Sequence, residues 1–199
     1  MLRTTNNNKA KRTILGIDPG TNILGWGIIE TQGNKLKLVD LGHLDMSKIK
    51  NPYEKLHEIH SGLCSVIDNY KPTESSIEAP FYGNNVQSML KLGRAQGVSI
   101  AACFSKGLSV EEYAPKKIKQ SITGNGNSSK EQLARMLQNI LALEEIPKHL
   151  DATDGVAAAV CHFYQKGLGG SSTKTGSSKK GGSNSWASFI AQNQDRVKK

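Results

Sequence analysis

Residues 14–21 read ILGIDPGT: a short apolar run that ends in Asp18 and is followed by proline and glycine. A run of this length before such breakers predicts a buried β-strand rather than a helix. The carboxylate then lies at the tip of the strand. Aspartate and proline are also favoured in tight turns, so a simple turn at Asp18 is the alternative.

Two other stretches also place acidic residues beside apolar runs. SSIEAP at 75–80 ends its run in Glu78, and HLDATDGVAAAV at 149–160 opens one with Asp151 and Asp154. Positions i and i+3 share one face of a helix. The alternatives are a solvated strand end at Glu78, and an N-cap at Asp151 with Asp154 at the third helical position.

Four carboxylates gathered in one cleft would repel one another unless cations neutralised them, so the set predicts a divalent metal site. Two magnesium ions roughly 4 Å apart can activate water and stabilise the charge of a phosphodiester under attack. We expect Asp18 to bridge the ions, Glu78 to bind one, and Asp151 with Asp154 to bind the other. This hypothesis requires folding to bring the three segments together.

The rest of residues 13–165 alternates between strand and helix patterns. We expect strands at 13–17, 24–30, 35–41, 75–78 and 109–113, and helices at 53–70, 85–104, 115–122, 130–143 and 151–165. Three strands followed by alternating helices and strands are typical of an α/β domain with a central mixed sheet flanked by helices.

Length and composition favour one globular domain that does not enter a membrane. The chain has 199 residues and a mean hydropathy of −0.44. No apolar run approaches the ~18 residues of a membrane span, and the N-terminus lacks the apolar core of a signal peptide. Three widely separated cysteines without metal-ligand spacing predict reduced thiols in a cytoplasmic protein.

The net charge of +9 belongs to the ends of the chain. Residues 1–12 hold four basic and no acidic groups, and residues 166–199 hold seven basic groups against one acidic group. The remaining body has a net charge of −1. We expect a flexible basic extension at 1–12, a nuclease domain at 13–166 and a disordered Gly/Ser/Lys-rich tail at 167–199. Any DNA-binding surface of the body must therefore be a local patch.

Two features could meet nucleic acid. Lys116, Lys117 and Lys119 cluster beside a predicted helix start, and Lys130 follows the turn GNGNSS, so these four could contact phosphates. Phe81, in a predicted loop, could stack on an unpaired base. The alternatives are a solvated basic face and an aromatic ring packed beneath its loop.

Small residues recur at one face of the predicted helix 85–104: Gly93, Gly97 and Ala101. Glycine within a helix costs about 1 kcal/mol relative to alanine. The stripe therefore predicts close backbone approach, either to the domain's own sheet or to a second subunit.

Five ordered blocks together resemble one family, the RuvC-type Holliday junction resolvases. They are ILGIDPGTNILGWGII, IEAPF, SMLKLGRAQGV, EYAPKKIKQSITGNGNSSK and DATDGVAAAV. The resemblance implies a ribonuclease H-like fold, a homodimer, Mg²⁺ or Mn²⁺, and paired nicks in like-polarity strands of a four-way DNA junction. It also implies 5′-phosphate and 3′-hydroxyl ends, a bacterial cytoplasmic location and coupling to a RuvA–RuvB branch-migration complex.

The resemblance also assigns roles to residues. The family's catalytic acids fall on Asp18, Glu78, Asp151 and Asp154, its basic residues near the scissile strand on Lys119 and Lys130, and its junction aromatic on Phe81. It favours the dimer interpretation of the small-residue stripe. Asn84 departs from the family, because many relatives carry lysine there.

Three other functions fit parts of the pattern. Actin- and sugar-kinase-type ATPases also carry Gly-Ile-Asp-x-Gly-Thr after a first strand, but they need two such domains and a longer chain. A non-catalytic junction-binding protein would gain nothing from acidic groups facing phosphates. A nuclease of the same chemistry could instead cut an RNA–DNA hybrid, which substrate comparison would decide.

Overall fold

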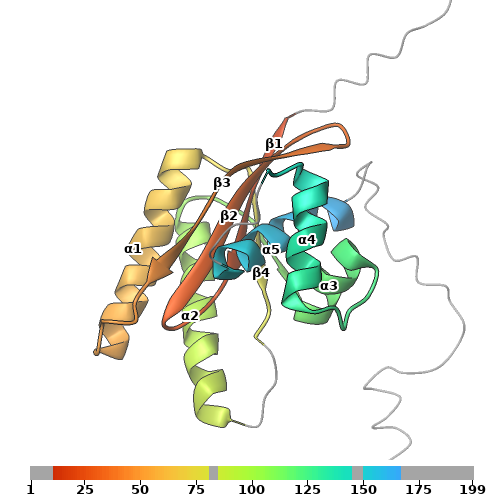
Figure 1. Cartoon of the computed structure of the whole chain (residues 1–199). Coiled ribbons are helices and arrows are strands. Elements are labelled where there is room, and N and C mark those ends of the chain that lie inside the picture. The colour runs from red at the N-terminus through yellow and green to blue at the C-terminus, as the bar shows by residue number, and fades with distance from the viewer. Residues whose placement is uncertain (1–10, 81–84, 145–149, 167–199) are drawn as a thin grey trace, which may run out of the picture. The chain divides into compact units, whose positions relative to one another are not determined.

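The computed structural model describes residues 11–80, 85–144 and 150–166, with only the backbone of residues 150 and 151. Its centre is a five-stranded mixed sheet in the order β3-β2-β1-β4-β5 (Figure 1). The strands are β1 (Arg12–Asp18), β2 (Ile23–Gln32), β3 (Lys35–Asp45), β4 (Glu74–Glu78) and β5 (Val110–Tyr113). The predicted α/β class with a mixed sheet is confirmed.

The first three strands form an antiparallel meander, and β4 and β5 extend it in parallel with β1. The β2–β3 turn contains Gly33 at φ +62°, a left-handed conformation that glycine adopts without steric cost. Parallel strands need long crossovers, and the helical segments between β1, β4 and β5 provide them. As a result, the carboxyl ends of β1, β4 and β5 share one edge of the sheet.

The five predicted helices are present. They are α1 (Pro52–Tyr70), α2 (Val86–Ser105), α3 (Pro115–Thr123), α4 (Lys130–Leu141) and α5 (Leu150–Lys166). Helix α4 begins with a capping box, in which Ser129 and Gln132 each accept a hydrogen bond from the other's backbone. It ends two residues before the predicted end, because Ala142 turns left-handed at φ 50° and caps it.

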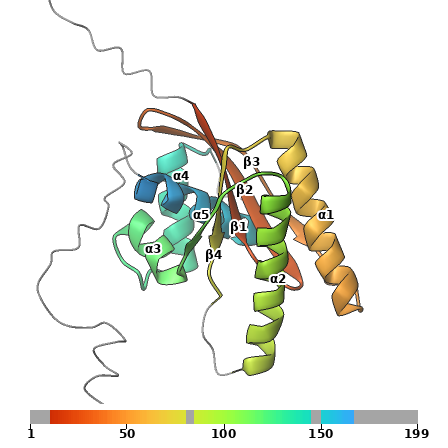
Figure 2. The same cartoon turned by 180° about the vertical axis from the view of Figure 1, so that it is seen from behind.

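Two hydrophobic cores lie on opposite faces of the sheet. The helices that cover these two faces are seen in Figures 1 and 2. Helices α1 and α2 cover one face, where side chains such as Leu15 and Ile17 are buried. The other face is covered by α5, with α3 and α4 packed beyond it, and buries Ile14 and Ile29. Consecutive residues of β1 thus supply opposite cores, which is why this strand reads as a continuous apolar run.

Several predictions concern residues outside this description. The basic extension up to residue 10, the tail at 167–199, Phe81 and Asn84 all lie outside the described residues. None of the described helices has the length and hydrophobicity that a bilayer crossing requires.

Candidate active site

Strand pairing places Asp18 and Glu78 side by side. β1 and β4 are parallel, with Gly16 opposite Ser76 and Ile17 opposite Ile77, and each strand ends one residue later at its carboxylate. Both acids therefore occupy the carboxyl edge of the sheet, on the face that α5 covers. Asp18 is paired with Gly25 of β2, so it ends a strand and is not part of an isolated turn.

Close packing of α5 on the sheet brings Asp154 to the same edge. A Cβ built on Gly155 would lie 2.6 Å from Trp26 Cα, and one built on Gly16 would lie 2.1 Å from the Gly155 carbonyl oxygen. Only glycine permits this approach of helix backbone to strand backbone. Asp154, one residue before the contact, is held with 15% of its side chain exposed.

The far end of α5 is tied down by a chain of polar contacts. Arg12 donates two hydrogen bonds to Glu74, at 2.5 and 2.8 Å, and Glu74 Oε2 lies 2.9 Å from Nε2 of the buried His162. The Nδ1 atom of His162 lies 2.9 Å from the Tyr113 hydroxyl. This network links α5 to β1, β4 and β5, so the helix that bears Asp154 is fixed at both ends.

The two strand-end acids face a cavity of about 210 Å³ at the sheet edge. The pKa of Glu78 is raised to about 8, first by burial and then by the neighbouring charges of Asp18 and Asp154, although Lys130 and Lys119 act in the opposite direction. Such electrostatic coupling requires that the three carboxylates lie close together. A divalent cation held among them would oppose the rise.

Two lysines approach the acidic residues from different helices. Lys130, at the start of α4, places Nζ 2.8 Å from Oδ2 of Asp154. Lys119, half-buried on α3, contributes its positive charge at Glu78. Lys119 and Lys130 therefore both place positive charge near the acidic residues, and their contact with DNA stays a prediction.

The donor chemistry fits magnesium or manganese, which prefer carboxylate oxygens. Within residues 11–80, 85–144 and 150–166, no group of three or more His, Cys, Asp or Glu side chains is arranged to hold an ion. The side chain of Asp151 lies outside the description, and its backbone is in the first turn of α5. Because α5 begins at Leu150, Asp151 lies inside the helix rather than at its N-cap.

The other predicted DNA-binding residues lie elsewhere. Lys116 and Lys117 are exposed on α3, and the stem of Lys116 packs against Gly126 of the following turn. Four cavity-lining residues were not predicted from the sequence: Pro19, Ala79, Pro80 and Leu92. The first three follow the acids directly in the sequence, which could have indicated them, whereas Leu92 comes from α2 and had no such signal.

The small-residue stripe of α2 faces away from the sheet. Gly93, Gly97 and Ala101 are exposed, and Cβ atoms built on the two glycines would meet nothing within 4 Å. The alternative of packing against the domain's own sheet is therefore wrong. Three large apolar side chains on the same helical face are also exposed: Val86, Leu90 and Phe104.

Comparisons with known proteins point to one family. A family model described as "Crossover junction endodeoxyribonuclease RuvC" matches residues 14–162. Proteins of that name from Christiangramia forsetii and Cytophaga hutchinsonii are 53% and 54% identical to this chain. These alignments cover 96% and 94% of the chain, and 95% and 88% of the respective relatives.

Solved structures agree. The structure titled "T. thermophilus RuvC in complex with Holliday junction substrate" superposes with a TM-score of 0.71 at 30% identity. The match covers 76% of this chain and 92% of that one. The predicted ribonuclease H-like fold is confirmed by this likeness.

Proposed function

This chain belongs to the RuvC family of crossover junction endodeoxyribonucleases, and we propose that its acidic cleft carries out the family's cleavage of four-way DNA junctions. The chain is thus a nuclease of DNA recombination and repair. The observation that carries the site assignment is that the charges of Asp18 and Asp154, which come from two other segments of the chain, both act on the carboxyl group of Glu78. Within this family, neither ATP hydrolysis nor purely structural DNA binding would explain the cluster of acidic residues.

Nucleases of this family depend on metal. We propose that Asp18, Glu78, Asp154 and Asp151 hold two Mg²⁺ ions, which Mn²⁺ can replace. When bound, these ions would supply charge neutralisation at the phosphate and lower the pKa of water. The protein's part is to fix the carboxylates on rigid elements, two strand ends and a helix anchored at both ends, so that little reorganisation is needed. Cleavage would leave a 5′-phosphate and a 3′-hydroxyl.

Basic residues at the rim would position the scissile strand. Lys119 and Lys130 place positive charge beside Glu78 and Asp154, where a phosphate would enter. The Lys130 ammonium group has three N–H donors, so it can donate a hydrogen bond to an entering phosphate as well as to Asp154. We assign Lys116 and Lys117 to more distant phosphate contacts, and Phe81 to stacking at the junction centre.

A homodimer follows from the substrate's symmetry. Paired nicks in strands of like polarity need two active sites related by a two-fold axis. We propose that the exposed face of α2, with Gly93, Gly97 and Ala101 at its centre, forms the subunit contact. Its support is the open space beyond both glycines and the exposed apolar side chains on either side.

Three further parts of the proposal rest on composition or on family membership. The nuclease domain would span residues 13–166, with a basic extension at 1–12 and a tail at 167–199. The enzyme would work in the bacterial cytoplasm. It would act with a RuvA–RuvB branch-migration complex.

The test compares Asp18→Asn with wild type on a synthetic four-way junction. Asp18→Asn should bind the junction without loss of affinity and lose cleavage by at least about 100-fold, as one ligand to a catalytic ion is removed. Asp68→Asn, an exposed aspartate on α1, is the matched control and should cut normally. An RNA–DNA hybrid in the same assay tests the other substrate class. Cleavage by Asp18→Asn at the wild-type rate would refute the site assignment.

A further inference from the structure

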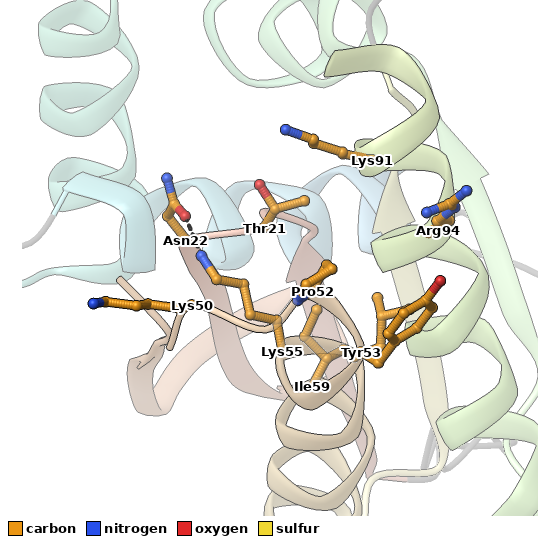
Figure 3. Close-up of a pocket in the computed structure, with 10 residues that line it drawn as sticks. Thr21, Asn22, Lys50, Pro52, Tyr53, Lys55, Ile59, Lys91 and Arg94 are labelled. Atoms are coloured by element: carbon orange, nitrogen blue, oxygen red, sulfur yellow. Dashed lines mark hydrogen bonds between the residues drawn. The ribbon is translucent and has the colours of Figure 1, made fainter. Parts of the chain in front are cut away.

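A second cavity lies next to the acidic cleft and is basic. It has a volume of about 310 Å³ and is bounded by the β1–β2 turn, the start of α1 and one side of α2 (Figure 3). Its polar lining consists of Thr21, Asn22, Lys50, Tyr53, Lys55, Lys91 and Arg94. No aspartate or glutamate belongs to this lining in the described part of the chain.

The four positive charges have no acidic partner within the part of the chain that the structure describes. None of the salt bridges among the described residues involves Lys50, Lys55, Lys91 or Arg94. Lys55 instead donates a hydrogen bond of 2.6 Å to the side-chain oxygen of Asn22 (Figure 3). Several positive charges around one cavity make its electrostatic potential positive, so the cavity favours an anion.

The two cavities share two of the segments that line them, the turn after β1 and helix α2. Asp18 and Pro19 line the acidic cleft, whereas Thr21 and Asn22 of the same turn line the basic cavity. On α2, Leu92 lines the acidic cleft, and its neighbour Lys91 lines the basic cavity. A strand bound at the acids therefore has the basic cavity within reach of its next phosphates, since successive phosphates advance only about 3.4 Å along a duplex axis.

We propose that this basic cavity binds the DNA backbone of the junction arm that continues from the cleavage point. The inference rests on the proposed function and adds a binding subsite to it. Lys91 and Arg94 would contact consecutive phosphates, and Thr21 and Asn22 would donate hydrogen bonds to phosphate oxygens. Tyr53 stands at the mouth with 72% of its surface exposed, where its ring can contact sugar or base. The subsite would hold the arm in register while the acids act.

The first experiment measures junction affinity against salt for full-length wild type and for Lys91→Gln/Arg94→Gln, in EDTA to prevent cleavage. Each lost phosphate contact lowers the salt slope by about 0.9, so the double variant should lose about 1.8. The affinity advantage of wild type should therefore shrink about twelvefold between 50 and 200 mM salt. Lys35→Gln/Lys37→Gln on β3 removes the same charge far from the cavity and should leave the slope unchanged.

The second experiment places three neutral methylphosphonate linkages beside the cleavage point, on its 5′ side in one junction and on its 3′ side in another. Wild type should bind one of these modified junctions several-fold more weakly than the unmodified junction. The double variant should bind both with the same affinity, because it already lacks the side chains that contact those phosphates. Additive losses in both junctions, or equal slope changes in the two double variants, would overturn the proposal.

Two checks separate the possible failures. Thermal unfolding and sedimentation must show that the double variant is folded and has the wild-type oligomeric state; a change of that state would place Arg94 in the subunit contact instead and overturn the assignment. If wild type itself neither binds nor cuts the junction, the proposed function fails. If wild type does both and the double variant matches it, only the subsite fails.

Discussion

Replacing Gly155 with alanine tests whether the contact between α5 and β2 sets the position of Asp154. The new Cβ would lie 2.6 Å from Trp26 Cα and 2.8 Å from the backbone N and C atoms of the same residue. Carbon atoms in contact prefer about 3.5–4.0 Å, so the helix must move away from the sheet by roughly 1 Å. The strand cannot yield instead, because β2 is hydrogen-bonded to β1 on one side and β3 on the other.

Two opposing effects decide the stability of this variant. Alanine gains about 1 kcal/mol of helix propensity over glycine. Overpacking a well-filled contact costs about 1–3 kcal/mol, and the upper end applies because the Cβ meets only backbone atoms. We therefore expect a net loss of about 2 kcal/mol in the free energy of unfolding, which lowers Tm by about 4–8 °C.

Activity should fall much further than stability. A displacement of about 1 Å at a catalytic group can cost roughly 100-fold in rate. Single-turnover cleavage of a four-way junction, measured well below the variant's Tm, gives the rate. Gln165→Ala, at an exposed position of the same helix, is the control and should match wild type. A Gly155→Ala enzyme with the wild-type rate would refute the argument that this contact positions Asp154.

Three further predictions follow from other parts of the structure. Although burial would raise the pKa of Glu74, its bonds to Arg12 and His162 lower it to about 2. The ionised carboxylate therefore stabilises the fold above its unfolded pKa of about 4.5. In urea unfolding, Glu74→Gln should be less stable than wild type at pH 6, and the difference should shrink as the pH falls from 4.5 toward 2; a constant difference would contradict this. Gly97→Leu should convert the dimer to a monomer in sedimentation, and the subunit itself should unfold at an unchanged Tm. The control Glu58→Leu, on α1, should leave the dimer intact. Lys119→Gln should lower the salt slope of junction binding by about 0.9, and an unchanged slope would remove Lys119 from the DNA contact.

Much of the fold could be predicted because its signals are local. Strand β1 is a short apolar run before the breakers Pro19 and Gly20, and α1 ends at Tyr70, before Lys71 and Pro72, as the sequence indicates. The adjacency of Asp18 and Glu78 was also predictable in kind, since parallel strands end at the same edge. The end of α4 was missed because Leu143 continues the apolar pattern beyond the residue where the backbone turns.

The remaining parts depend on contacts between segments distant in sequence. Nothing near His162 indicates that Glu74, 88 residues away, accepts its hydrogen bond. The role of Gly155 appears only when Trp26 is placed beneath it. Likewise, the basic cavity joins residues from three elements, and Lys91 and Arg94 read from sequence alone as part of an ordinary polar helix surface.

The order of the acidic residues along the chain has a consequence for the cell that makes this nuclease. Two carboxylates come from strands formed early in synthesis, but Asp154 arrives on α5, the last helix of the described chain. A ribosome-bound fragment that stops short of α5 lacks the helix that packs on that face of the sheet, and with it part of the proposed ligand set. Incompletely synthesised chains should therefore not cut chromosomal DNA, because nuclease activity appears only when the domain is complete.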